Sequence, residues 1–286
     1  MKLELPSSIT KIELDGRDFY IKRDDLVDPY LSGNKFRKLY ALIKTPKQNL
    51  KRVISYGGTQ SNAMLSIAYM CHKKGWEFIY YTKPISKTQE ILSDGNYKKA
   101  LEFGMKHIQV SLDEYKEYIS SLRFNLDPFT FVVDQGGAIK EAKEGLKVLA
   151  DEIKELSFSS LASPSGTGTT ALFLATSLPK HKVYTIPCIG DEAYLRQELE
   201  ALSPIPPNLS ILKPKKKYHF AKPYVEFLEI YHKLLGLGVE FDLLYAPSLW
   251  LALLEQTDED ILYIHSGGVY GNTTMLARYT KKGIYV

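Results

Sequence analysis

The feature that most constrains the fold is a repeated succession of short apolar segments, glycine-containing turns and helical patterns. Apolar runs at 53–56, 76–82, 129–133 and 261–264 have the length and the β-branched or aromatic composition of buried strands. Several of them lead through glycine into segments of helical length. Strands that alternate with helices in this way form βαβ units, which belong to sheets of parallel strands. The pattern therefore predicts an α/β protein with mostly parallel sheets.

The same pattern assigns most of the chain to expected elements. Further strands are expected at 106–110 and 183–187, and the expected helices cover 62–72, 91–103, 139–156, 169–177, 192–202 and 223–235. A polar stretch rich in proline and lysine, 203–217, interrupts the alternation, and two short apolar segments follow at 243–245 and 249–255. Because no flexible linker divides the chain, we expect any second domain to be inserted within the first.

Composition and charge argue against several classes of protein. The formal charge of +4 is small for 286 residues, and the lysine run at 213–217 is short and lacks interleaved aromatics, so we interpret it as a solvated loop rather than a nucleic-acid site. No apolar run approaches the length of a membrane helix, and no signal peptide is expected. Cys71 and Cys188 fit neither a disulfide framework nor a metal site and are expected to be buried. We therefore expect a cytoplasmic protein without nucleic acid, membrane or metal partners.

One lysine occupies a position suited to covalent chemistry. Lys35 directly follows a Ser-Gly-Asn turn and begins a segment with a helical pattern. A lysine in a tight turn is partly desolvated, which disfavours its ammonium form and frees the amine to attack a carbonyl. Asp24 and Asp25 are expected to brace this loop. Arg37 and Lys38 are expected to lie on the solvated surface of the helix.

A glycine- and hydroxyl-rich turn at 163–170 is a candidate phosphate site. Its sequence is Ser-Pro-Ser-Gly-Thr-Gly-Thr-Thr, it follows an apolar stretch and it opens an expected helix. Converging backbone N–H groups and the helix dipole favour an anion at such a turn. The alternative is an ordinary helix cap after a flexible turn.

Two other turns are candidates for binding a small ligand. In the Gly-Gly-Thr-Gln-Ser-Asn turn at 57–62, Ser61 is a candidate proton carrier or nucleophile and Asn62 a candidate donor to an oxyanion, although a plain helix cap is an equal alternative. In the His-Ser-Gly-Gly turn at 265–268, Ser266 either faces a ligand ring or lies in a turn of purely structural importance. Ligands in parallel sheets bind beyond the carboxyl ends of strands, where these turns fall.

In their order and sequence these motifs resemble the 1-aminocyclopropane-1-carboxylate deaminase/D-cysteine desulfhydrase family. Members of that family are pyridoxal-phosphate (PLP) enzymes of the tryptophan-synthase β-like fold, which is PLP fold type II. The resemblance spans roughly residues 21–268. It implies two three-layer α/β/α domains with mostly parallel sheets and the cofactor in the cleft between them. The implied large domain comprises 1–39 and 149–286, and the implied small domain is 40–148. The resemblance also implies a homodimer.

The resemblance further implies a role for each motif. Lys35 would hold PLP as a Schiff base and move the substrate Cα proton, assisted by Ser61. Asn62 would bind the phenolic oxygen of the cofactor, and Ser266 would lie at its pyridine nitrogen. The implied cofactor-binding set is Lys35, Asn62, Ser165, Gly166, Thr167, Gly168, Thr169, Thr170 and Ser266, and the implied substrate-binding set is Gln60, Ser61, Asn62, Phe220 and Leu249.

Departures from the family pattern point to the reaction. Ala63 replaces a histidine. The late Asp-Pro-Val-Tyr-Thr/Glu-Gly-Lys motif of the family aligns with Ala-Pro-Ser-Leu-Trp-Leu-Ala at 246–252, so that Leu249 replaces a substrate-contacting tyrosine and Trp250 replaces a glutamate near the pyridine nitrogen. Phe220 replaces a second tyrosine. The loss of these phenols removes candidate acids for cyclopropane ring opening.

The remaining expected partner of the pyridine nitrogen is the neutral hydroxyl of Ser266, which suits α,β-elimination. We therefore expect a lyase of a small amino acid, most nearly a D-cysteine desulfhydrase that yields pyruvate, ammonia and sulfide. The alternatives are a 1-aminocyclopropane-1-carboxylate deaminase, an amino-acid racemase, and a PLP-binding protein with little turnover.

Overall fold

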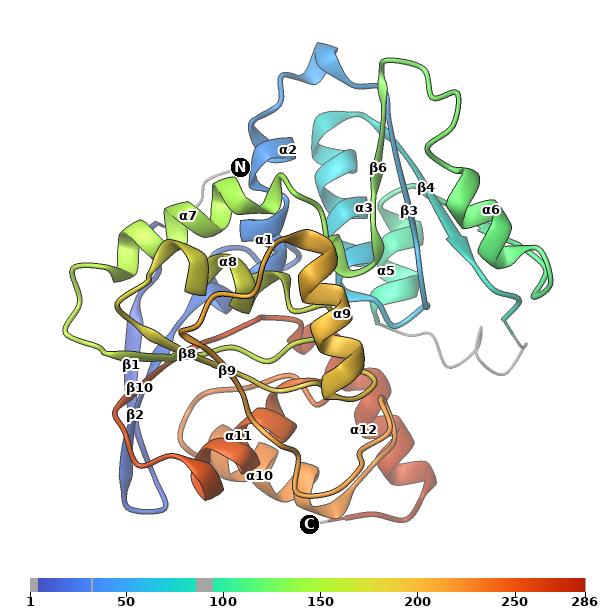
Figure 1. Ribbon diagram of the computed structural model, residues 1–286. Coiled ribbons are helices and arrows are strands. Elements are labelled where there is room, and N and C mark those ends of the chain that lie inside the picture. Colours follow the sequence, from blue (N-terminus) through green and yellow to red (C-terminus); the bar gives the residue numbers. More distant parts are fainter. Residues whose placement is uncertain (1–4, 32, 86–94, 286) are drawn as a thin grey trace.

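The structure consists of two sheets with helices packed around them (Figure 1). It is a computed structural model that describes residues 5–31, 33–85 and 95–285. The strands of one sheet all lie within 52–133, whereas those of the other come from 9–22 and 160–264. The predicted α/β class with mostly parallel sheets is confirmed. The predicted domain boundaries at 39/40 and 148/149 stay a prediction.

The larger sheet has six strands in the order β1-β2-β10-β7-β8-β9. Their bounds are Ile9–Leu14 (β1), Arg17–Lys22 (β2), Ile261–Ile264 (β10), Ser160–Ala162 (β7), Lys182–Thr185 (β8) and Leu209–Ile211 (β9). Only the β1–β2 pair is antiparallel. Every residue of β7 and β10 is buried, because these central strands are covered on both faces, and this explains the uninterrupted apolar sequence of β10.

The smaller sheet has four parallel strands in the order β5-β4-β3-β6. Their bounds are Met105–Gln109 (β5), Glu77–Thr82 (β4), Arg52–Tyr56 (β3) and Thr130–Val133 (β6). These strands lie within one or two residues of the ranges predicted from the sequence. Since all four are parallel, the turns that follow β3 and β6 leave the sheet at the same edge.

The helices that cover the sheets are mostly those expected. Their bounds are Asn34–Lys38 (α1), Tyr40–Lys44 (α2), Asn62–Lys74 (α3), Asn96–Glu102 (α5), Tyr115–Ser121 (α6), Ala142–Ile153 (α7), Thr169–Ser177 (α8), Glu192–Leu202 (α9), Val225–Gly236 (α10), Ala246–Gln256 (α11) and Asn272–Lys281 (α12). Within the described ranges, no helix is long and apolar enough to cross a membrane. Residues 91–94 of the helix expected at 91–103 lie outside the described residues.

A continuous apolar core joins the two sheets. It runs from Met64 of α3 through Phe36 of α1 and Leu146 of α7 to Leu172 of α8 and Leu262 of β10, each of which is completely or almost completely buried. Cys71 belongs to this core and is buried as expected, whereas Cys188 is only partly buried. The short helix α1 therefore packs where the cores of the two sheets meet, which fixes the position of the residues it carries.

The β1–β2 hairpin was not among the predicted elements. Its turn is Asp15-Gly16, with φ angles of 50° and 77°. An Asp-Gly pair between alternating apolar residues is the usual sequence of a two-residue hairpin turn, so the chain did contain a signal for it. The short strand β9 also lies unpredicted within the polar stretch 203–217.

Candidate active site

The turns singled out in the sequence meet around one cavity of about 300 Å³. They follow the carboxyl ends of β3, β7 and β10, as parallel topology requires. Of the predicted site residues, those that line the cavity are Lys35, Gln60, Ser61, Asn62, Ser165, Gly166, Thr167, Gly168, Thr169, Thr170, Phe220 and Ser266. The structure therefore brings residues from both sheets to a single site, while the roles assigned to them stay predictions.

Lys35 lies in the first turn of α1, close to Ser266. The two residues before it, Gly33 and Asn34, contact the His-Ser-Gly-Gly turn. The Asn34 N–H donates to the Ser266 carbonyl at 3.2 Å, and a Cβ on Gly33 (φ 59°) would lie 2.0 Å from that oxygen. Only glycine fits this approach. Ser32 of the predicted turn lies outside the described residues.

The environment of Lys35 favours a neutral amine. Burial lowers its pKa to about 8, and the carboxylate of Asp242 acts in the opposite direction. The Lys35 ammonium donates to Asn34 Oδ1 at 2.8 Å. An amine with this pKa is partly in its free-base form near neutral pH, which is the form that attacks a carbonyl or accepts a proton.

The turn at 163–170 combines the features of an anion site. Gly168 has a φ of 72° and precedes α8, and a Cβ there would lie 2.3 Å from Leu199. The first N–H groups of α8 have no partner within the helix and are therefore available to an anion. Thr170 lines the cavity, and its buried hydroxyl has no hydrogen-bond partner among the described residues.

Lys38 adds a buried amine to the same cavity. The sequence predicted a solvated position for Lys38, and that prediction is wrong: Lys38 is 4% exposed and lines the cavity. Burial and the charge of Lys35 together keep the pKa of Lys38 well below its usual value. Its ammonium donates to the Gly136 carbonyl at 3.2 Å, which leaves further N–H donors for a ligand. One turn of helix separates Lys35 from Lys38, so both face the cavity.

Ser61 both caps a helix and lines the cavity. Its Oγ accepts the Met64 N–H at 3.2 Å, which is the structural alternative considered for this turn. The neighbouring Asn62 side chain accepts from Asn96 Nδ2 at 2.7 Å and lies against Gly268 of the His-Ser-Gly-Gly turn. Asn62 thus connects the small sheet to the turn that carries Ser266.

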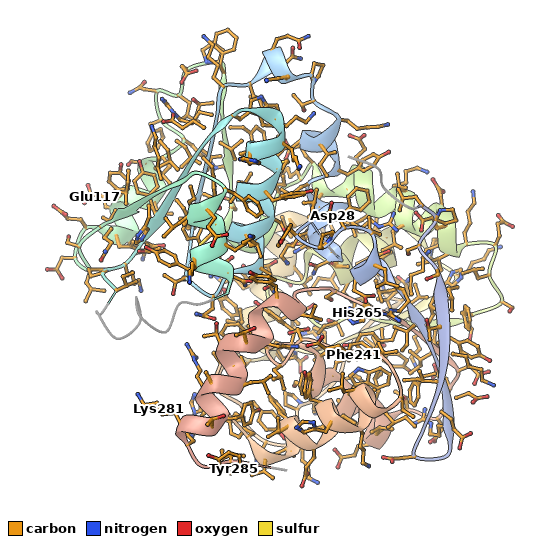
Figure 2. The ribbon with its side chains drawn as sticks, turned by 180° about the vertical axis from the view of Figure 1, so that it is seen from behind. Asp28, Glu117, Phe241, His265, Lys281 and Tyr285 are labelled. Atoms are coloured by element: carbon orange, nitrogen blue, oxygen red, sulfur yellow. The ribbon has the colours of Figure 1, made fainter. Side chains whose placement is uncertain are left out.

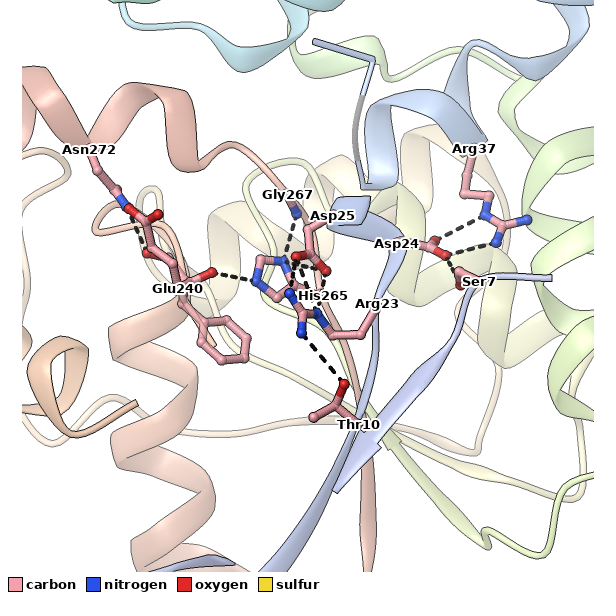
Figure 3. Close-up of polar contacts among 11 residues, drawn as sticks. Ser7, Thr10, Arg23, Asp24, Asp25, Arg37, Glu240, His265, Gly267 and Asn272 are labelled. Carbon is pink, nitrogen blue, oxygen red and sulfur yellow. Dashed lines mark hydrogen bonds and ion pairs between the residues drawn. The ribbon is translucent and has the colours of Figure 1, made fainter. Parts of the chain in front are cut away.

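Ser266 has a buried hydroxyl without a hydrogen-bond partner in the described structure. Its backbone is held by His265, whose Nδ1 accepts the Gly267 N–H at 3.0 Å and whose Nε2 lies 2.8 Å from the Glu240 carbonyl (Figure 3). Since that carbonyl can only accept, Nε2 carries the proton and the imidazole is neutral. Burial accordingly lowers the pKa of His265. Figure 2 shows His265 beside Phe241 in the interior, where the two rings stack at 4.3 Å.

A buried ionic cluster supports α1 from behind. Arg37 donates to Asp24 at 2.8 and 3.0 Å and to Glu152 at 2.7 and 3.0 Å (Figure 3 shows the Asp24 contacts). Lys22 pairs with Glu152 at 2.8 Å, and Ser7 donates to Asp24 at 2.6 Å. The predicted bracing by Asp24 is confirmed. The predicted solvation of Arg37 is wrong, because its side chain is fully buried.

Leu249 and Trp250 do not reach the cavity. Both are completely buried in the apolar core under the larger sheet, and Trp250 stacks on Tyr263 at 4.6 Å. The expected substrate contact of Leu249 is therefore wrong, because α11 turns this face onto the sheet. The position of Trp250 likewise cannot be that of a residue beside a ligand ring.

Asp242 and Tyr245 line the cavity instead, although sequence reasoning missed them. They belong to Asp-Leu-Leu-Tyr, which has the spacing of the family's Asp-Pro-Val-Tyr but lies four residues before the segment first aligned with it. Asp242 accepts the N–H groups of Leu244 and Tyr245 at 3.0 and 2.7 Å, and its burial raises its pKa to about 6. The ring of Phe220 lies 5.3 Å from that of Tyr245.

The sequence is similar to those of two known proteins over most of its length. No family model matches the chain. It is 24% identical over 286 residues to a putative 1-aminocyclopropane-1-carboxylate deaminase of Thermotoga maritima, with 90% of each chain covered. It is 26% identical over 287 residues to a D-cysteine desulfhydrase of Yersinia enterocolitica, covering 88% of this chain and 87% of that one.

The fold is also that of a solved structure. A crystal structure of an ACC deaminase homologue superposes with a TM-score of 0.75, at 23% identity, over 96% of this chain and 94% of the other. The likeness extends over both sheets, since it covers almost the whole chain.

Proposed function

The chain belongs to the 1-aminocyclopropane-1-carboxylate deaminase/D-cysteine desulfhydrase family, whose members depend on PLP, and from this premise we propose that it is a PLP-dependent lyase that performs α,β-elimination on a small amino acid related to D-cysteine. The alignment with the Thermotoga maritima relative covers about nine-tenths of the chain. The proposed substrate and reaction are inferred from the residues that line the cavity.

The donors of the cavity fit the chemical groups of PLP. The N-terminus of α8, the Thr170 hydroxyl and the N–H donors of the Lys38 side chain suit a phosphate. Asn62 offers an amide to a phenolic oxygen, and the unpartnered hydroxyl of Ser266 suits a pyridine nitrogen. Bound PLP would supply an electron sink for the negative charge that develops when a Cα proton leaves.

The protein groups divide the remaining work. Lys35, with its pKa lowered to about 8, accepts the Cα proton of the substrate. Gln60, Ser61 and Asn62 receive the substrate carboxylate. Tyr245 keeps its proton, because burial raises its pKa, and offers a hydrogen bond to the group that leaves Cβ. The Cα–H and Cβ–S bonds break, the sulfur leaves with the bonding electron pair as hydrosulfide, and water hydrolyses the resulting 2-aminoacrylate to pyruvate and ammonia.

The observation that carries the elimination reading is the neutral hydroxyl of Ser266. The corrected alignment puts Ala246, which has no polar side-chain atom, after the motif tyrosine, where the ring-opening deaminases have a glutamate. Of the two positions that the motif comparison assigns to the pyridine nitrogen, the one that still carries a polar side chain is therefore Ser266, which lines the cavity. A hydroxyl leaves the ring less fully protonated than a carboxylate does, which suffices when a good leaving group departs from Cβ.

A 1-aminocyclopropane-1-carboxylate deaminase is the second candidate. It gains support from Tyr245, because a phenol in the cavity restores one of the two acids that the sequence had suggested were lost. Phe220 still lacks the other. Ring opening would release 2-oxobutyrate, so the two candidates differ in product.

Substrate profiling decides between them. Purified holoprotein is incubated with D-cysteine, L-cysteine, β-chloroalanine and 1-aminocyclopropane-1-carboxylate, and pyruvate, sulfide, ammonia and 2-oxobutyrate are measured. We expect pyruvate from one or more of the first three. Formation of 2-oxobutyrate without pyruvate would establish the deaminase. Exchange of the Cα proton without release of ammonia would establish a racemase, and the absence of any turnover would establish a binding protein.

Lysine assignment has its own test. Borohydride reduction of the holoprotein followed by peptide mapping should place the cofactor mass on Lys35 and not on Lys38, although both line the cavity. Lys35→Ala should abolish the lysine-bound absorbance band, whereas Lys44→Ala, on the exposed side of α2, should keep it. The implied homodimer stays a prediction that sedimentation analysis can test.

A further inference from the structure

A second, open cavity of about 480 Å³ adjoins the site on the side of the smaller sheet. Its walls include the turn after β3, the loop after β4, and Ala221 and Arg278 from the larger sheet's side. It shares Gly58, Gln60, Gln135 and Phe220 with the cavity around Lys35. The two cavities are therefore neighbours, and these shared residues form their common boundary.

The charged side chains of this outer cavity are positive. Lys83, after β4, and Arg278, on α12 (the red helix of Figure 1), both line it, and none of the described residues that line it is Asp or Glu. The hollow on the other side of Phe220 differs, since Asp191 and Glu192 lie there among lysines. The cavity at Arg278 therefore differs from this hollow in having cations and no carboxylate among its described lining residues.

Arg278 has donors to spare. Its guanidinium donates to the Ala221 carbonyl at 3.0 Å, and this is its one hydrogen bond within the described residues. It forms no ion pair there with a carboxylate, although it is only partly exposed. A guanidinium has five N–H donors in a planar fork that matches the two oxygens of a carboxylate. Lys83 likewise has no acidic partner in the described part of the chain and lies over the Tyr115 ring at 5.5 Å.

We propose that Arg278, with Lys83, binds an acidic group at the far end of the substrate's Cβ substituent. The inference rests on the proposed elimination, which assigns the α-carboxylate to Gln60, Ser61 and Asn62 and so leaves the outer cations for a second anion. The substrates of this enzyme are then β-substituted amino acids with an additional carboxylate or comparable anion. Phe220 lines both the cavity around Lys35 and the cavity that holds this anion site.

Matched pairs of substrates test the proposal. S-Carboxymethylcysteine is compared with its neutral amide, S-carbamoylmethylcysteine, and the pair with one more methylene follows, each as both enantiomers. Affinity is measured from inhibition of β-chloroalanine turnover and, independently, from the rise in melting temperature that each ligand gives the holoprotein. We expect the acid to bind roughly ten- to one-hundred-fold more tightly than its amide, the range for hydrogen bonds to charged groups.

Variants locate the effect. Arg278→Met should bring the acid-to-amide ratio close to one, and Arg278→Lys should restore part of it. Arg196→Met removes an exposed arginine that pairs with Glu192 on α9 and should leave the ratio unchanged. A ratio near one in the wild-type protein at both arm lengths, or an unchanged ratio in Arg278→Met, overturns the proposal.

The melting-temperature measurement separates this proposal from the proposed function. If β-chloroalanine yields no pyruvate but acids still stabilise the holoprotein more than amides through Arg278, elimination fails and the anion site stands. If pyruvate forms normally and acids have no advantage, elimination stands and the anion site fails.

Discussion

Replacement of Arg37 by methionine should destabilise the protein strongly. The guanidinium is fully buried and makes hydrogen bonds of 2.7–3.0 Å to two carboxylates, one of which, on Asp24, is also completely buried. Methionine preserves much of the volume but leaves Asp24 with the Ser7 hydroxyl as its remaining side-chain partner. Breaking a buried ion pair by removing one partner costs about 3–5 kcal/mol. We expect a loss of that size in the free energy of unfolding.

Urea denaturation followed by circular dichroism measures the loss, with an unchanged m-value as evidence that the denatured state is comparable. Arg196→Met is the matched control, since its pair with Glu192 is about half exposed and should contribute less than about 1 kcal/mol. If Arg37→Met loses no more than this control, the ionic cluster does not support α1 as reasoned here. Because α1 carries Lys35, the variant should also release PLP at lower temperature than the wild type.

Three other predictions follow from the site. The rate at which apoprotein captures PLP should rise with pH through a midpoint near pH 8, where half of Lys35 is neutral, and then level off. Asp242→Asn should move this midpoint to lower pH, and a midpoint near the usual lysine pKa of 10.5 would contradict the lowered pKa. Gly33→Ala should lower both the melting temperature and PLP retention, because its Cβ would lie 2.0 Å from the Ser266 carbonyl, whereas Gly238→Ala, with open space around it, should cost only the strain of its positive φ. Finally, burial raises the pKa of Glu152, but its hydrogen bonds and charge contacts with Arg37 and Lys22 outweigh burial and hold the pKa below the usual 4.5. The contribution of Glu152 to stability is therefore complete above pH 4.5 and is lost as the pH falls below it. Glu152→Gln should accordingly make the free energy of unfolding depend less on pH in this range.

The sequence was sufficient for the parallel architecture and for the gathering of the turns. Both follow from local rules: apolar strands lead through glycine into helices, and parallel strands end at one edge. The residues that motif reasoning named at Lys35, Ser61, Thr170 and Ser266 accordingly line one cavity.

The failures have a common physical origin in tertiary packing. Arg37 and Lys38 look like surface charges because helix α1 is short and its sequence gives no sign that both sheets enclose it. The late motif was misplaced because Pro247 matched the family proline, although that proline lies in the first turn of α11. The Asp-x-x-Tyr spacing at Asp242 and Tyr245 was the better signal, since these two residues line the cavity around Lys35.

The position of β10 within the larger sheet bears on how the site comes into being. This strand pairs with β2 on one side and β7 on the other, so residues 261–264 insert between partners that lie far earlier in the chain. Pairings of such long sequence separation form slowly, because the intervening loop must close first. The strands of the smaller sheet need no such late partner, since all lie within 52–133. We therefore expect Lys35 and Ser266 to meet only when this insertion is complete, so that a cofactor bound between them would be captured late in the folding of the chain.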